Sequence, residues 1–168
     1  MLEQTKRVRI WAPWVMGDYL RPRVKSAAAE ILLVKGPRKL GENLWSTGTM
    51  GRGVKEHGLV IATAEGPVLI TGCAHPGVHH LAARAASLAG GKLRFVLGGF
   101  HLEGIGEEKL TALIAALREF TSAVFPGHCT GKGPSSALIR RVPGKRGAPG
   151  RLLPEDGLSR RHLSQNWL

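Results

Sequence analysis

Three histidines follow apolar runs in this chain of 168 residues, and imidazole is both a common metal ligand and an acid or base near neutral pH. His75 comes after "VLITGCA", His101 after "FVLGGF" and His128 after "AVFPG", at intervals of 26 and then 27 residues. A single histidine at the end of a strand is more often a polar cap than a ligand. Three at matching positions instead predict a zinc-like site with three nitrogen ligands and a fourth position open for water.

The apolar runs are predicted strands, and helices separate them. Residues 58–63 and 66–72 are β-rich and flank a short turn, which predicts a hairpin. Residues 78–88 and a segment within 103–120 have apolar side chains at helical spacing. An alternation of strands and helices predicts an α/β layer, in which ligands bind beyond the carboxyl ends of the strands. The two remaining strands are predicted within residues 92–100 and 122–127. The three histidines are therefore expected at one edge of the sheet.

Two cysteines accompany the histidines. Cys73 and Cys129 each lie within two residues of a predicted ligand, and two cysteines do not make a disulfide framework. We expect free thiols that pack as small neighbours of the site, with Cys129 and Cys73 as candidates for an extra ligand. Glycines at positions 72, 98, 99 and 127 are expected to let the backbone turn sharply there.

A general base is harder to choose, because few acids lie near the histidines in the sequence. Glu103, two residues after His101, is the candidate catalytic acid or base, although its charge would also suit the start of a helix. Ser46 and Thr47 are candidates for substrate binding, with an ordinary role in a turn as the alternative.

The net charge of +12 lies almost entirely in the flanks, because residues 41–131 contain equal numbers of basic and acidic side chains. We therefore divide the chain into a basic N-terminal flank (1–30), a central domain (31–131) and a tail rich in Gly, Pro and Arg (132–168). The tail has no sustained period and is interpreted as mostly mobile. Basic flanks suit nucleic acid, although the sparse aromatic residues offer no stacking platform.

No run of 18 apolar residues and no signal-like segment occurs, so we expect a cytoplasmic protein that does not bind membranes.

Five segments carry a family resemblance in the order "NLWSTGTM", "EHGLVIAT", "VLITGCAHPG", "VLGGFHL" and "PGHCTG". Over residues 31–131 the chain resembles metallo-β-lactamase-fold hydrolases, in particular the branch similar to dihydropterin-methyl-ribofuranosylaminobenzene phosphate synthase. The resemblance implies that His75 is a ligand of a first metal and His128 of a second. His101 stands where the wider family has a residue that bridges the metals, so it is expected to bind one metal or to line the site.

The chain departs from the family in one important respect, since the His-x-His-x-Asp-His motif of the first half is missing. The only aspartates are Asp18 and Asp156, and His79 and His80 are expected on a solvated helix face. The resemblance therefore implies an α/β fold equal to half of an αββα sandwich, with a mixed sheet and helices on one face. Such a half would leave an apolar sheet face bare, and we expect a homodimer to complete it.

The expected function is a metal-dependent hydrolase of activated esters or phosphoesters, with loose specificity, that uses a metal-bound water. Zinc is the expected metal, and manganese and iron are the alternatives. Two other functions stay open: a metal-binding remnant of the family without activity, and a nucleic-acid-binding protein that uses the basic flanks.

Overall fold

The chain folds around a six-stranded mixed sheet, seen in a computed structural model that describes residues 8–24 and 29–142. The strand order in space follows the order in the sequence. Neighbouring strands are antiparallel from the first to the fourth and parallel from the fourth to the sixth. The strands are β3 (Arg38–Gly41), β4 (Leu44–Ser46), β5 (Leu59–Ile61), β6 (Val68–Thr71), β7 (Phe95–Gly99) and β8 (Val124–Gly127).

The predicted hairpin and parallel strands are confirmed. β5 and β6 pair antiparallel with Val60 opposite Leu69, and β7 and β8 continue the sheet in parallel. The carboxyl ends of β6, β7 and β8 therefore meet at one edge, as the alternation of strands and helices predicted.

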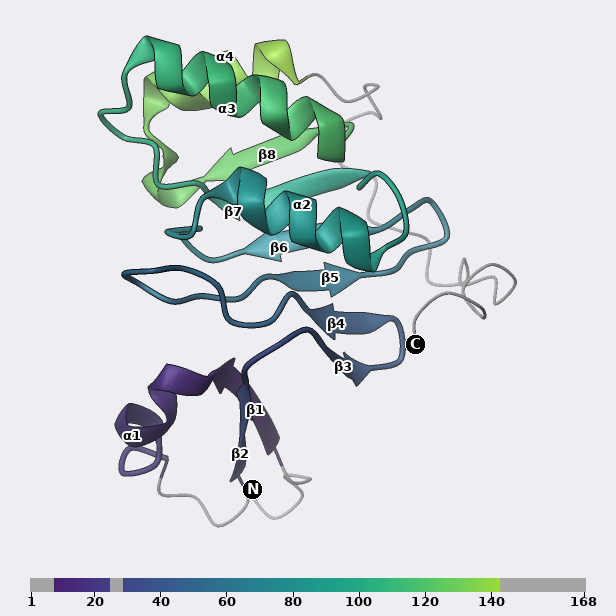
Figure 1. The fold of residues 1–168 in the computed structure, drawn as a ribbon, viewed down its shortest axis with the longest axis vertical. Coiled ribbons are helices and arrows are strands. Elements are labelled where there is room, and N and C mark those ends of the chain that lie inside the picture. The colour runs from purple at the N-terminus through teal and green to yellow at the C-terminus, as the bar shows by residue number, and fades with distance from the viewer. Residues whose placement is uncertain (1–7, 25–28, 143–168) are drawn as a thin grey trace, which may run out of the picture.

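Helices α2 (Val78–Leu88) and α3 (Glu107–Phe120) lie side by side over one face of the sheet (Figure 1). Both were predicted from apolar spacing, and their inner faces are fully buried, for example at Leu81 and Leu117. These side chains pack with strand residues such as Leu69 in one core. The core fixes both helices, and with them the loop between β6 and α2, relative to the strand ends.

The first part of the predicted tail, residues 132–142, is folded. A short helical turn, η2 (His128–Thr130), leads into helix α4 (Lys132–Arg141), which contacts β8 and α3. Leu138 and Val142 are buried in the main core. The segment was missed because a single core position among Gly, Pro, Ser and Arg gives almost no helical period. The rest of the predicted tail, 143–168, lies outside the described residues.

Part of the predicted N-terminal flank is also folded. Strands β1 (Val8–Pro13) and β2 (Ala29–Val34) pair in parallel as a separate two-stranded sheet. The turn η1 (Trp14–Met16) and the short helix α1 (Gly17–Leu20) follow β1. Residues 31–34, the apolar part of β2, begin the predicted central domain.

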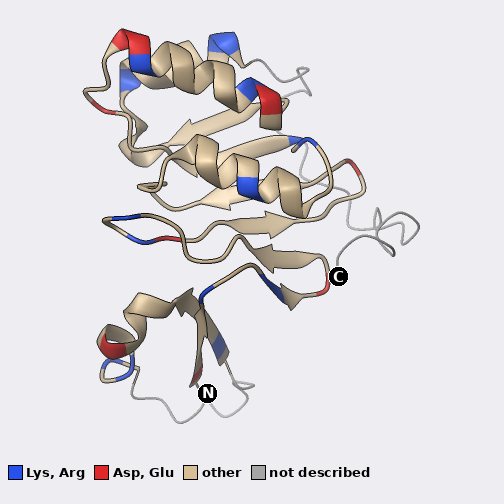
Figure 2. Ribbon diagram, viewed as in Figure 1, with Lys and Arg blue, Asp and Glu red and all other residues tan. Residues whose placement is uncertain are grey.

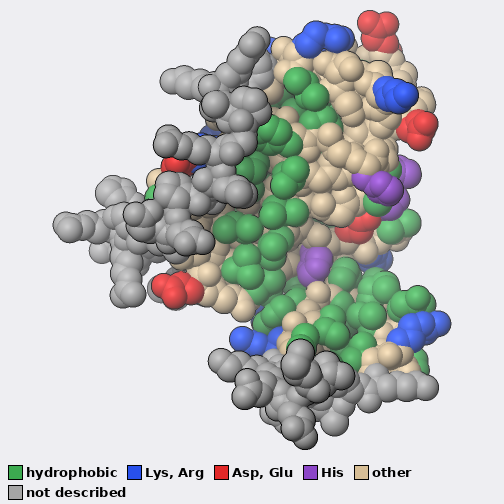
Figure 3. All heavy atoms as spheres, turned by 180° about the vertical axis from the view of Figure 1, so that it is seen from behind, with side chains coloured by type: hydrophobic (Ala, Val, Ile, Leu, Met, Phe, Trp, Pro, Cys, Tyr) green, Lys and Arg blue, Asp and Glu red, His purple; other side chains and the backbone are tan. Residues whose placement is uncertain are grey.

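The face of the sheet opposite α2 and α3 exposes apolar side chains over a continuous area (Figure 3). Leu97 and Phe125 are 41% and 52% exposed, and the rings of Phe95 and Phe125 meet edge to face at 5.2 Å. Lys, Arg, Asp and Glu lie mainly in loops and on helices (Figure 2). Within the described ranges, no helix is long and apolar enough to cross a membrane.

Candidate active site at the ends of the parallel strands

The three predicted histidines lie in the loops that follow the three parallel strands. His75 comes four residues after the end of β6, His101 two residues after β7, and His128 directly after β8. The predicted placement at one edge of the sheet is confirmed.

Each of these loops contains a non-glycine residue with a left-handed backbone. The φ angles are +56° at Ala74, +47° at His101 and +35° at His128. Such angles are uncommon for residues with a side chain, and they persist where the surrounding structure enforces them. Strain of this kind gathers at functional sites, and here it marks all three strand-end loops.

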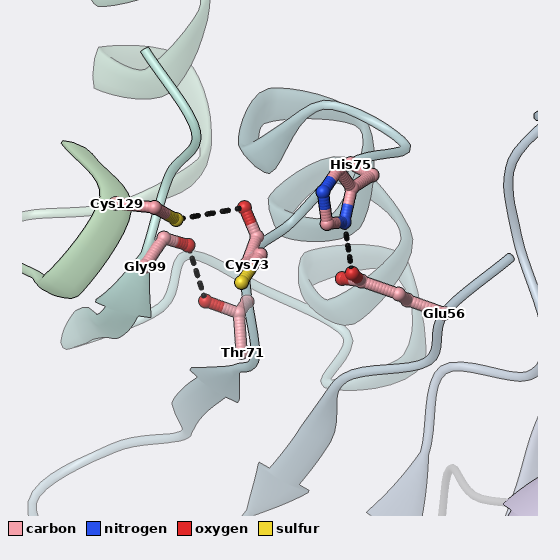
Figure 4. Close-up of polar contacts among 6 residues, drawn as sticks. All are labelled: Glu56, Thr71, Cys73, His75, Gly99 and Cys129. Carbon is pink, nitrogen blue, oxygen red and sulfur yellow. Dashed lines mark hydrogen bonds and ion pairs between the residues drawn. The ribbon is translucent and has the colours of Figure 1, made fainter. Parts of the chain in front are cut away.

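The strand ends approach one another closely at two of the four glycines singled out from the sequence. A Cβ on Gly98, where φ is +137°, would lie 2.3 Å from the carbonyl oxygen of Thr71. A Cβ on Gly99 would lie 2.9 Å from Sγ of Cys129. The Thr71 hydroxyl also donates to the Gly99 carbonyl at 3.2 Å (Figure 4). A Cβ on Gly72 or Gly127 would meet no protein atom closer than 3.8 Å.

A second hydroxyl joins the other two loops. Thr130, which is fully buried, donates to the Gly127 carbonyl at 2.6 Å and accepts from the Phe100 N–H at 3.1 Å. Thr71 and Thr130 together fix the three loops as one unit.

An unexpected carboxylate binds the first histidine. Oε1 of Glu56 hydrogen-bonds with Nδ1 of His75 (Figure 4), and the side chains are 19% and 28% exposed. The other oxygen, Oε2, is buried without a hydrogen-bond partner. Metal-binding histidines usually use one ring nitrogen for the metal and the other for such a carboxylate. Because Glu56 uses Nδ1, Nε2 is the nitrogen of His75 that would serve as a metal ligand.

Two of the three histidines lie together. The rings of His75 and His101 are 4.3 Å apart between centroids and inclined by 47°. His128 is exposed, and no contact joins it to either ring in the part of the chain that the structure describes. No group of three or more His, Cys, Asp or Glu among the described residues is arranged to hold a metal ion. His75 and His101, with Glu56 behind them, thus fit part of a metal site, and the three-histidine set stays a prediction.

The cysteines lie between these loops. The Cys129 thiol donates weakly to the Cys73 carbonyl at 3.9 Å (Figure 4). A hydrogen bond with Cys129 and, secondarily, burial raise the pKa of the Cys73 thiol. Both side chains are partly buried, and their role as extra ligands stays untested.

The side chains of Ser46 and Thr47 are buried, and their contact with a substrate stays a prediction. Thr47 Oγ1 accepts from the Gly58 N–H at 2.8 Å and donates to the Gly48 carbonyl. Ser46 Oγ hydrogen-bonds with Nδ1 of His57 at 2.9 Å. Both hydroxyls therefore hold the loop between β4 and β5, the turn role that was the alternative.

Glu103 is exposed, and none of its contacts in the described ranges involves a histidine of the site. Glu56, which the sequence analysis did not single out, is the acid seen to contact His75 among the described residues, and the role of Glu103 as acid or base stays a prediction. Glu56 lies in the quoted segment "EHGLVIAT", which was the available signal, but nineteen positions separate it from His75.

The predicted solvated face of α2 is correct for His80, which is exposed, and wrong for His79. His79 is partly buried, and its Nδ1 has no partner. Burial, together with the neighbouring His80, lowers the pKa of His79.

Comparison with solved structures defines the class of fold. The chain matches the crystal structure of a metal-dependent hydrolase of the β-lactamase superfamily with a TM-score of 0.68 and 22% identity. The match includes 83% of this chain, a larger share than residues 31–131, and 67% of the other. The chain therefore has the metallo-β-lactamase fold over about two thirds of the neighbour's length, and the expected fold class is confirmed.

Curated relatives narrow the resemblance. Over 78 residues the chain is 36% identical to 7,8-dihydropterin-6-methyl-4-(beta-D-ribofuranosyl)-aminobenzene-5'-phosphate synthase of Methanocaldococcus jannaschii. Over 64 residues it is 34% identical to an uncharacterised protein of the same organism. These matches cover 45% and 38% of this chain but about a quarter of each relative, 26% and 24%. The resemblance to the synthase branch is thus confirmed over part of the chain. No protein-family model matches.

Proposed function

We propose that this chain is a metal-dependent hydrolase of activated esters or phosphoesters, with its reaction centre at His75. The observation that carries the proposal is the Glu56–His75 pair beside the ring of His101, in loops held in left-handed conformations. The structural neighbour is described as a metal-dependent hydrolase, which favours the same class of enzyme for this chain. The name of the curated relative, a synthase, leaves the particular reaction open.

In this proposal the metal is held by His75 and His101, with His128 and the two cysteines as candidates for completing the site. Zinc is the expected ion, with manganese and iron as alternatives, and a bound ion would polarise the ester or phosphoryl oxygen under attack. Glu56 fixes the ring of His75 through Nδ1, so that Nε2 points away from the carboxylate.

The proposal is tested by metal content and hydrolysis together. Purified wild type should contain about one metal ion per chain and hydrolyse p-nitrophenyl acetate or a phosphodiester analogue. His75→Ala should lose both, while His80→Ala, an exposed histidine on α2, should keep the metal. Full hydrolysis by His75→Ala would overturn the proposal. Bound metal without hydrolysis in the wild type would instead favour the inactive metal-binding alternative.

The alternative of nucleic-acid binding depends on basic residues of the flanks, part of which lie in 1–7 and 143–168, outside the described residues. It predicts a salt-sensitive affinity that survives substitution of His75, His101 and His128.

We also propose that a second copy of the chain covers the apolar sheet face. The exposed Leu97 and Phe125 lie opposite each other on β7 and β8. The structural neighbour has about a third of its length without a counterpart here. Figure 3 shows the apolar area on this side of the molecule. Burying a large apolar face against another copy removes it from water, which favours association.

A further inference from the structure

A cavity of about 850 Å³ lies beside His75. One wall is the loop of residues 50–53, and His75 and Pro76 form part of the lining between that loop and α2. The other wall is one face of α2, which presents His80, Ala83, Arg84 and Ser87 at helical spacing.

Arginines stand on both walls of this cavity, and no acid lines it. Arg52 comes from the loop and Arg84 from α2. Helix α2 has one basic position and no acidic one (Figure 2). Within the described ranges the two ion pairs are His75–Glu56 and Arg94–Glu65, so neither arginine of the cavity is neutralised by a carboxylate.

The wall that carries Arg52 is a loop that hydrogen bonds close at its base. The backbones of Met50 and Glu56 pair at its base through hydrogen bonds of 2.7 and 3.0 Å. A Cβ on Gly51, where φ is +108°, would lie 2.5 Å from the Val54 carbonyl and 3.3 Å from Pro76. Glu56, which closes the loop, is also the residue that binds His75, so this wall and the proposed reaction centre are built from the same element.

We propose that this cavity binds a phosphate group of the substrate, next to the bond that is cleaved at His75. Two guanidinium groups that have no ion-pair partner among the described residues suit a dianion, because each can make paired hydrogen bonds to its oxygens. The inference rests on the proposed function for the position of the scissile bond. It adds the substrate class, a phosphate-bearing ester or phosphoester.

The test measures binding of inorganic phosphate, which needs no catalysis. Titration calorimetry at about 0.15 M salt should show that Arg84→Ala and Arg52→Ala each weaken phosphate binding about tenfold or more. Arg118→Ala is the matched control, since it removes the same charge from an exposed position of α3. It should bind phosphate as the wild type does. Amide chemical shifts on phosphate addition should change at Arg52 and Arg84.

Three results would overturn the inference. They are no phosphate binding by the wild type, phosphate binding weakened equally in Arg118→Ala, and amide chemical-shift changes that occur at neither Arg52 nor Arg84. Acetate is the control anion, and equal affinity for acetate and phosphate would exclude a phosphate-selective site.

Hydrolysis of neutral p-nitrophenyl acetate by the wild type separates this inference from the proposed function. Phosphate binding without hydrolysis would contradict only the proposed function, and hydrolysis without phosphate binding would contradict only the subsite.

Discussion

The carboxylate of Glu56 hydrogen-bonds with Nδ1 of His75 across nineteen positions of sequence. The backbone of Glu56 also closes the loop that carries Arg52. One residue therefore fixes both the imidazole at the end of β6 and one wall of the adjoining cavity. Because the loop is closed by the backbone of Glu56, a change of its side chain should affect the chemistry at His75 more than it affects folding.

Glu56→Gln should lower metal affinity and kcat/KM by about tenfold to a hundredfold, because a neutral amide holds the imidazole less firmly and makes it a weaker ligand. Metal titration and steady-state hydrolysis would measure both. Glu119→Gln, an exposed change in the last turn of α3, should leave both unchanged. Wild-type values for both quantities in Glu56→Gln would show that the carboxylate has no part in the site.

Gly98→Ala should destabilise the fold by about 2 kcal/mol or more, because a Cβ there meets the Thr71 carbonyl and the left-handed φ disfavours a side chain. Denaturant unfolding measures the loss. The control is Gly91→Ala, where a Cβ would meet no atom within 4 Å. Equal stability of the two variants would contradict the close approach of β6 and β7.

The edge of the sheet that carries the histidines could be predicted because strand and helix periods are local properties of the sequence. His75, His101 and His128 each follow an apolar run, and the alternation of elements places such ends together. Glu56 could not be assigned in this way, since its contact with His75 depends on how a distant loop closes. Glu103 was chosen by closeness in sequence, which does not measure distance in a folded chain.

Helix α4 gives a second example of this limit. Its only buried residue is Leu138, and the side chains around it resemble those of a tail. What fixes α4 is contact with β8 and α3, and tertiary packing of this kind overrides weak local propensity.

Leu138→Ala should cost about 2–5 kcal/mol of unfolding free energy, because the side chain is fully buried in the main core. The matched change Ile139→Ala, at a side chain that is 55% exposed, should cost much less. Thermal or denaturant unfolding distinguishes the two. A Leu138→Ala variant as stable as the wild type would mean that α4 is not part of the cooperative unit.

Acidification should destabilise the fold through His57. Burial lowers the pKa of this imidazole below its ordinary 6.5, and the charge of Glu56 opposes the shift only in part. The unfolded chain then binds the proton more readily than the folded chain. The stability that neutral His57 contributes is therefore fully present above pH 6.5, and it is lost as the pH falls toward the lowered pKa of the folded state. The unfolding free energy should therefore decrease as the pH falls from 7.5 to about 5.

His57→Asn is the variant that isolates this contribution. Asparagine can place an oxygen near the position of Nδ1, keep the hydrogen bond with Ser46 and never titrate. Its stability should decrease less steeply on acidification than that of the wild type. Identical slopes would assign the acid sensitivity to other groups, of which the partly buried His79, whose pKa is also lowered, is the first to examine.

Phe125→Ser should shift the chain from dimer toward monomer, with the dissociation constant raised about tenfold or more, because the exposed aromatic ring lies on the face proposed to meet a second copy. Light scattering after size-exclusion chromatography would measure the mass at several concentrations. Val54→Ser, a similarly exposed apolar side chain in the loop between β4 and β5, is the control and should leave the mass unchanged. A monomeric wild type at every concentration would contradict self-association, and the bare sheet face would then need a different partner chain.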